Sequence, residues 1–139
     1  PGDVDPLAGV IVALEQMVSA IRQRCKQARI IVRGDSAFAR EDLMAWCETQ
    51  RPGVYYCFGL GRNARLEALI PDALAAARAR RCLTGAVSAR EFKDLEYQTR
   101  ESWSRSRRVV AKAEYLAKGE NPRFVTTSLT RPSGYLSFQ

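Results

Sequence analysis

A short apolar run that ends in a carboxylate constrains the fold of this chain more than any other feature. The β-branched residues of Ile30-Ile31-Val32 are followed at once by Arg33-Gly34-Asp35. Helical patterns lie on both sides, so we expect a buried central strand over residues 29–34 with Asp35 at its carboxyl end. Open α/β sheets place their functional residues at that end. Asp35 is therefore the first candidate site residue, although an Asp in such a turn is also a common helix cap.

The segments around this run indicate an α/β core. Residues 7–25 carry apolar side chains at helical spacing and should pack that stripe on a sheet, and residues 40–49 form a second helical pattern. Residues 54–58 are a second apolar run, so the strand–helix–strand order predicts a right-handed parallel crossover. The pattern over 63–81 is helical again, with a kink or a restart at Pro71, which has no amide hydrogen.

The character of the sequence changes after Gly85. Three runs there alternate with a period of two and are separated by turn residues: 92–99, 107–116 and 123–128. Such runs are typical of an antiparallel β unit. The predicted fold class is therefore α/β, with a helix-strand-helix-strand core over 1–84 followed by a β-rich unit and loop tail over 85–139.

Composition excludes several classes of site. The chain has no His, which removes Ser-His and Cys-His mechanisms and leaves carboxylates as the catalytic groups. Any metal is then expected to be a hard, oxygen-ligated ion. Cys25, Cys47 and Cys57 lie in apolar patterns typical of buried thiols. No stretch approaches the roughly 20 apolar residues of a membrane span, and no secretion signal is visible, so we expect a cytoplasmic protein with no membrane partner.

The charge is distributed unevenly along the chain. The net charge of +7 comes entirely from residues 62–139, which hold fifteen basic and eight acidic side chains, whereas residues 1–61 are neutral. A basic part joined to a neutral core favours a polyanionic partner such as nucleic acid, although a solvated arginine-rich surface gives the same count.

Two basic segments are candidate nucleic-acid contacts. The first lies after a predicted strand and the Gly59-Leu60-Gly61 turn and contains Arg62, Asn63 and Arg65. These side chains either bind a phosphate backbone or belong to a solvated turn. The segment 100–108 combines arginines with an aromatic ring, and its candidate residues are Trp103, Arg105, Arg107 and Arg108. Arginine with an exposed aromatic ring suits phosphate contact and base stacking, whereas Trp103 is alternatively part of the β unit's core.

Taken together, these segments resemble the transposase DDE domain group 1 of bacterial insertion sequences. The resemblance rests on five ordered blocks: Ile30-Ile31-Val32-Arg33-Gly34-Asp35-Ser36-Ala37-Phe38, Leu43-Met44-Ala45-Trp46-Cys47-Glu48, Tyr56-Cys57-Phe58-Gly59-Leu60 with Arg62-Asn63-Ala64-Arg65-Leu66, Ser102-Trp103-Ser104-Arg105 with Arg107-Arg108-Val109-Val110-Ala111-Lys112-Ala113-Glu114, and Asn121-Pro122-Arg123-Phe124-Val125-Thr126-Thr127-Ser128-Leu129. Small departures are Gly34, where the family pattern has Ala, and Ala37, where it has Gly.

The resemblance implies an RNase H-like core, here partial, with a β-rich insertion. It implies two Asp and one Glu that bind two Mg²⁺ ions for DNA strand cleavage and transfer, with Asp35 as the second Asp. It also implies DNA as the partner, namely transposon ends and target, a homodimer in the intact protein and a bacterial, nucleoid-associated location.

The other two carboxylates of the family pattern have no match here. The first Asp belongs on a strand before the helix at 7–25, and Asp3 and Asp5 lie in no strand-like context. The final Glu belongs on a helix after the insertion, for which Glu114 and Glu120 are poor substitutes. We therefore expect an internal fragment of a transposase that is inactive alone.

Two alternatives remain open at this point. The chain could be a non-catalytic basic nucleic-acid-binding α/β module that works alone. It could also be a fragment that no longer folds properly, because an RNase H-like sheet without its first strands exposes an edge and apolar surface.

Overall fold

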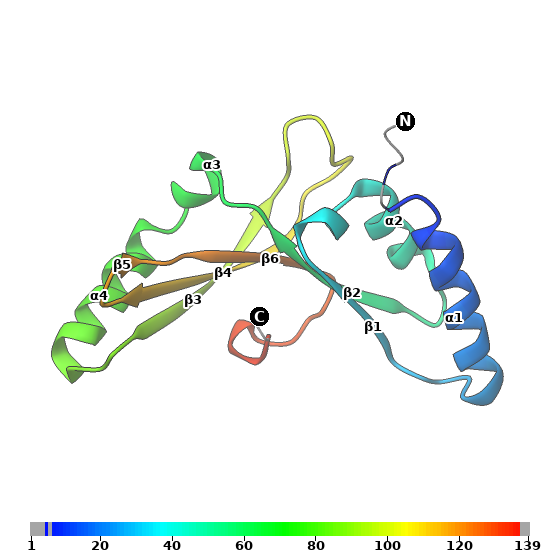
Figure 1. Cartoon of the computed structure of the whole chain (residues 1–139), viewed down its shortest axis with the longest axis horizontal. Coiled ribbons are helices and arrows are strands. Elements are labelled where there is room, and N and C mark those ends of the chain that lie inside the picture. Colours follow the sequence, from blue (N-terminus) through cyan, green and yellow to red (C-terminus); the bar gives the residue numbers. More distant parts are fainter. Residues whose placement is uncertain (1–4, 6, 137–139) are drawn as a thin grey trace.

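The computed structural model describes residue 5 and residues 7–136 of the chain (Figure 1). The helices are α1 (Val10–Arg24), α2 (Glu41–Thr49), α3 (Ala64–Glu67) and α4 (Pro71–Thr84), with short 3₁₀ turns η1 (Ser36–Phe38) and η2 (Ser133–Tyr135). The strands are β1 (Ile30–Gly34), β2 (Val54–Leu60), β3 (Ala89–Tyr97), β4 (Arg107–Leu116), β5 (Gly119–Glu120) and β6 (Arg123–Thr127). The predicted α/β class is confirmed.

One sheet unites all of these strands. Its order is β1-β2-β6-β4-β3, with β5 paired to β4 at its side. The pair β1–β2 is parallel, as predicted, and the other pairs are antiparallel. Because β6 lies between β2 and β4, the strands after residue 85 continue the sheet that the first part begins. The division into parts 1–84 and 85–139 remains a prediction.

The predicted restart at Pro71 is present in the structure. Helix α3 ends at Glu67, and Pro71 is the first residue of α4, where its missing amide hydrogen and fixed φ cost nothing. The short strand β5 was not predicted, because two residues carry no alternation to recognise.

The prediction of a central strand at residues 29–34 is wrong. Among the described residues β1 pairs with β2 alone, so it is an edge strand, and Ile31 is 41% exposed. Ile30 and Val32 pack against the core, whereas Ile31 and Arg33 point away from it. The strand therefore alternates, but an apolar Ile31 on the outer face hides that alternation in the sequence.

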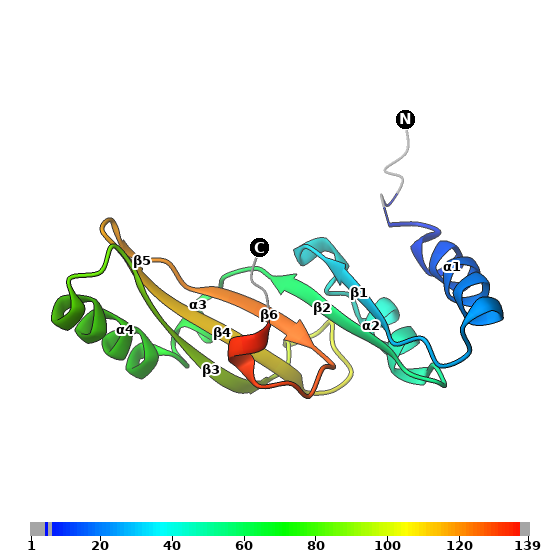
Figure 2. The ribbon, with the colours of Figure 1, turned by 90° about the horizontal axis from the view of Figure 1, so that it is seen from below.

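All four helices pack on one face of the sheet. Each contributes a buried side chain to the main core cluster, for example Val18 of α1 and Leu66 of α3. Every second residue of β2 faces this cluster, including Tyr56 and Phe58. The intervening positions face the other side, where a small cluster forms from Val110, Leu129 and Leu136 with Tyr55 and Phe92. Figure 2 shows the η2 segment lying across β6 and β4 on this helix-free face.

Helix α1 packs less fully than its apolar stripe predicts. Val10, Ile11, Leu14 and Val18 contact the core as expected. Further apolar side chains of α1 are exposed to solvent, namely Val12, Met17 and Ile21. Of the cysteines expected to be buried, Cys47 and Cys57 are, but Cys25 is exposed because it follows the last residue of the helix.

A buried ion cluster joins the beginning of β4 to helix α2. The Arg107 side chain is only 3% exposed, and its guanidinium donates to both Glu41 and Glu48 at distances of 2.8 to 3.1 Å. The Tyr56 hydroxyl also donates to Glu48, at 2.9 Å. Glu41 and Glu48 are seven residues apart and so lie on one face of α2. Both carboxylates thus converge on one bidentate cation.

We expect Arg107→Ala to destabilise the fold by about 3 kcal/mol or more, because it leaves two partly buried carboxylates without their cation. Urea unfolding followed by circular dichroism measures this change. Arg105→Ala is the matched control, because Arg105 bonds the same Glu48 but is 61% exposed, and it should cost less than about 1 kcal/mol. Equal losses for the two variants would contradict a structural role for the buried guanidinium.

Candidate functional site

Asp35 lies where the sequence predicts it, immediately after β1. It is exposed, and its Oδ1 accepts a 2.9 Å hydrogen bond from the Ala37 amide. It is also the N-cap of η1, so the helix-cap interpretation is confirmed for its local conformation. One carboxylate oxygen makes that cap, and the carboxylate remains accessible from solvent.

A cleft of about 620 Å³ opens beside Asp35 at the carboxyl ends of the two parallel strands. Its walls come from the end of β1, the end of β2 and the beginning of β6. Among the described residues, Asp35 is the one acidic side chain of its lining. The basic and amide side chains of the lining are Arg33, Arg62, Asn121 and Arg123. The cleft therefore combines one carboxylate with a cationic wall.

Two glycines hold the Asp35 turn against the sheet. A Cβ atom on Gly59 would lie 3.2 Å from the Ser36 amide nitrogen and 3.3 Å from the Asp35 carbonyl carbon. A Cβ atom on Gly34 would lie 2.5 Å from the Phe38 ring, which also packs on Phe58 with ring centroids 6.0 Å apart. The absence of a side chain at Gly59 allows the backbone of the turn to approach β2 closely, and its absence at Gly34 leaves room for the Phe38 ring.

The described residues do not form a two-metal site by themselves. Within residues 5 and 7–136, no group of three or more His, Cys, Asp or Glu side chains is placed to hold a metal ion. The two Mg²⁺ ions implied by the resemblance need carboxylates from several elements. Asp35 fits one such ligand, and Glu114 does not join it, because its oxygens accept from Lys112 at 3.1 Å and Asn121 at 2.8 Å.

The three predicted contacts near the glycine turn are all engaged within the protein. Arg62 lines the cleft and bonds Glu67 through its Nε at 2.8 Å. Asn63 caps α3 by accepting from the Leu66 amide at 3.0 Å. Arg65 stacks on the Tyr97 ring with 5.1 Å between guanidinium carbon and ring centroid. All three residues are nevertheless exposed.

Trp103 and Arg107 are buried, so neither side chain is available for a base or phosphate. Trp103 is 4% exposed, packs edge-on against Tyr97 and donates its indole N–H to the Ala39 carbonyl at 3.3 Å. The alternative that placed Trp103 in the core is confirmed. One signal in the sequence points to the burial of Arg107: the spacing of Glu41 and Glu48 puts both carboxylates on one face of a helix, where they bind a shared cation.

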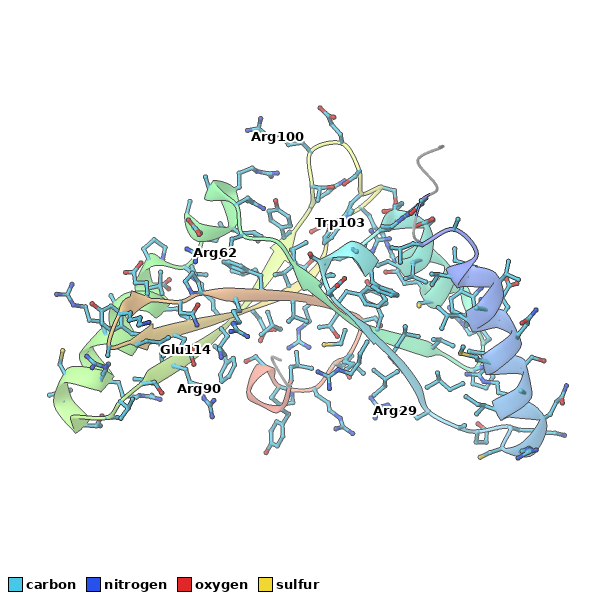
Figure 3. All side chains as sticks on the ribbon, viewed as in Figure 1. Arg29, Arg62, Arg90, Arg100, Trp103 and Glu114 are labelled. Carbon is cyan, nitrogen blue, oxygen red and sulfur yellow. The ribbon has the colours of Figure 1, made fainter. Side chains whose placement is uncertain are left out.

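Of the other two predicted arginine contacts in that segment, Arg105 is exposed and Arg108 is partly buried. Arg105 is 61% exposed and pairs with Glu48 at 2.6 Å. The Nε of Arg108 donates to Asp94 at 2.6 Å, and its Nη1 donates to the Leu129 and Arg131 carbonyls. Figure 3 shows Arg100 at the tip of this loop and Trp103 turned inward toward the body of the protein.

The sequence analysis missed Arg33 and Arg123 as site residues. Both line the cleft with Asp35, one from the end of β1 and one from the start of β6. Arg33 is two residues from Asp35, which is a local signal. Arg123 has no such signal, because only the pairing of β6 with β2 brings it to the same edge.

Electrostatics lowers the pKa of both carboxylates that bind Arg107. The hydrogen bond from Arg107 lowers the pKa of Glu41 to about 2. Burial alone would raise the pKa of Glu48, but the bonds from Arg107, Arg105 and Tyr56 outweigh it and hold the pKa below its usual range. The charged forms are therefore the stable ones at neutral pH.

We expect the fold to lose stability as the pH falls from about 5 to about 2, since a carboxyl group whose pKa is lowered by folding stabilises only while it is ionised. The stabilisation is fully present above the unfolded pKa and disappears toward the folded one. Thermal unfolding as a function of pH measures the effect. Glu41→Gln should flatten this pH dependence, and an unchanged slope would contradict the assigned cause.

Comparison with known proteins gives one match. A family model described as Transposase DDE domain group 1 matches residues 1–136. No curated protein and no solved structure matches the chain. The described part of the chain contains no helix long and apolar enough to cross a membrane.

Proposed function

We propose that this chain, which belongs to the transposase DDE domain group 1 family, supplies Asp35 to a site for metal-dependent DNA strand cleavage and transfer. The family indicates DNA transposition, and it implies polynucleotidyl transfer in general with DNA as the substrate. Divalent metal ions serve such transfer by activating a water or hydroxyl and stabilising the leaving oxygen. The finer assignment to Asp35 is our proposal.

The observation that carries this proposal is the cleft itself. Asp35 is the carboxylate at the carboxyl ends of two parallel strands, and arginines line the same cavity. Carboxylate oxygens are preferred ligands of Mg²⁺, and guanidinium groups neutralise phosphodiester oxygens. A cleft with both kinds of group suits a phosphate substrate held beside a metal ligand.

The single carboxylate of the cleft limits the catalytic activity that we propose for the chain alone. The described residues provide one carboxylate in the cleft, whereas the family resemblance implies three. We therefore propose that the purified chain of 139 residues does not transfer DNA strands by itself. We also propose DNA contacts from the exposed members of the predicted set, namely Arg62, Asn63, Arg65 and Arg105, and from Arg108, which is partly buried.

We expect Mn²⁺ to broaden the amide NMR signals of Ser36 and Ala37 in the purified chain, because these amides lie next to the Asp35 carboxylate. Asp35→Asn should abolish the broadening. The control is Asp42→Asn, which removes another exposed Asp and should leave the effect intact.

Two results would overturn this proposal. The absence of selective broadening around Asp35 would remove the metal-ligand role and favour a non-catalytic nucleic-acid-binding module. Mg²⁺-dependent cleavage or transfer of DNA by the chain alone would contradict the proposed need for further carboxylates.

A further inference from the structure

The helix-free face of the sheet is the most basic surface that the strands build. Strand alternation and the Tyr55 contact of Arg29 place the following basic side chains there: Arg29, Arg33, Arg90, Arg108, Lys112 and Arg123. Three acidic side chains share the face along the described strands: Asp94, Glu96 and Glu114. Figure 3 shows Arg29 and Arg90 on the side of the ribbon where the C-terminal segment lies.

The acidic side chains of this face are already bound. Asp94 pairs with Arg108, and Glu114 pairs with Lys112 and Asn121. Glu96 accepts a hydrogen bond from the Ser106 hydroxyl at 3.2 Å. Arg90 lies opposite Glu114 in the β3–β4 register, but no salt bridge joins them. Glu96 keeps its charge, because a hydroxyl does not neutralise it, and the six basic and three acidic side chains leave a net charge of +3 on this face.

Three arginines carry that excess. Arg29, Arg90 and Arg123 are exposed, and none of them forms a salt bridge with any residue of the part that the structure describes. Arg29 stacks on Tyr55 with 5.0 Å between guanidinium carbon and ring centroid, which orients the group without neutralising it. The predicted DNA contacts Arg62 and Arg105 differ from these three arginines, because each of them forms a salt bridge with a glutamate.

The placement of these arginines suits an extended polyanion. Arg123 and Arg90 lie two strands apart, which corresponds to about 10 Å across the sheet and about 7 Å along it. Arg29 lies on the edge strand's side of the same face, and Arg131, which is exposed, belongs to the C-terminal segment and accepts a hydrogen bond from Arg108 of this face. Arg123 also lines the Asp35 cleft, so the basic face and the cleft are continuous.

We propose that the helix-free face binds the sugar-phosphate backbone of DNA through Arg29, Arg90 and Arg123 and leads it into the Asp35 cleft. This deepens the proposed function, on which it rests, by naming the surface that holds the DNA. The contacts are to phosphates, so binding is independent of sequence and falls with added salt. Arginines that form no salt bridge bind phosphate without first breaking one.

The test compares two triple variants that lower the net charge by the same amount. The face variant is Arg29→Gln, Arg90→Gln and Arg123→Gln, and the loop variant is Arg62→Gln, Arg65→Gln and Arg105→Gln. The probe is a duplex of about 20 base pairs with arbitrary sequence, in EDTA, with affinity measured by fluorescence anisotropy across a salt series. Circular dichroism confirms that both variants are folded.

The proposal predicts that the face variant weakens binding by about tenfold or more and reduces the salt slope by about two to three, whereas the loop variant changes both less. A larger loss in the loop variant would overturn it. Concentration-dependent dimerisation that only the face variant abolishes would overturn it too, by showing that a second copy covers this face. The Mn²⁺ broadening at Asp35 is measured without DNA, so its failure and the failure of this proposal are distinguishable.

Discussion

The structure depends on the backbone hydrogen bonds of β6, which join the distant strand β2 on one side to the neighbouring strand β4 on the other. β6 lies antiparallel to β2 on one side and to β4 on the other. Side chains reinforce the junction, because the Thr127 hydroxyl donates to the Tyr56 carbonyl at 2.7 Å and Ser128 accepts from the Tyr56 amide at 3.0 Å. Without β6 the sheet would divide into the parallel pair β1–β2 and the antiparallel pair β3–β4.

The same strand completes the candidate site. β1 and β2 bring Asp35 and Gly59 to one edge, and the first residues of β6 close the remaining wall with Arg123. The residues of the cleft therefore come from segments about 90 positions apart. The buried Arg107 cluster has the same character, because it joins the beginning of β4 to helix α2. Long-range pairing, rather than local preference, holds the functional edge together.

The sequence predicts what local patterns determine. The limits of β4, the restart at Pro71 and the position of Asp35 follow from alternation, from a missing amide hydrogen and from an apolar run that ends in a carboxylate. Local patterns do not determine the position of a strand within its sheet. For this reason β1 was predicted at the centre of the sheet, whereas it lies at the edge. The burial of Arg107 was missed for the same reason, because its partners are about 60 residues away. Among the site residues, Arg33 was within reach of sequence reasoning and Arg123 was not.

The open side of β1 has a consequence for the behaviour of the protein in concentrated solution. An edge strand with an apolar outer residue such as Ile31 is a template on which another chain can form hydrogen bonds. Arg29 and Arg33 flank this segment, and two copies that met edge to edge would bring these charges together. The two arginines thus act as gatekeepers against aggregation. A polyanion that neutralises them would remove this protection, so the proposed DNA binding would also favour self-association of the chain through this strand.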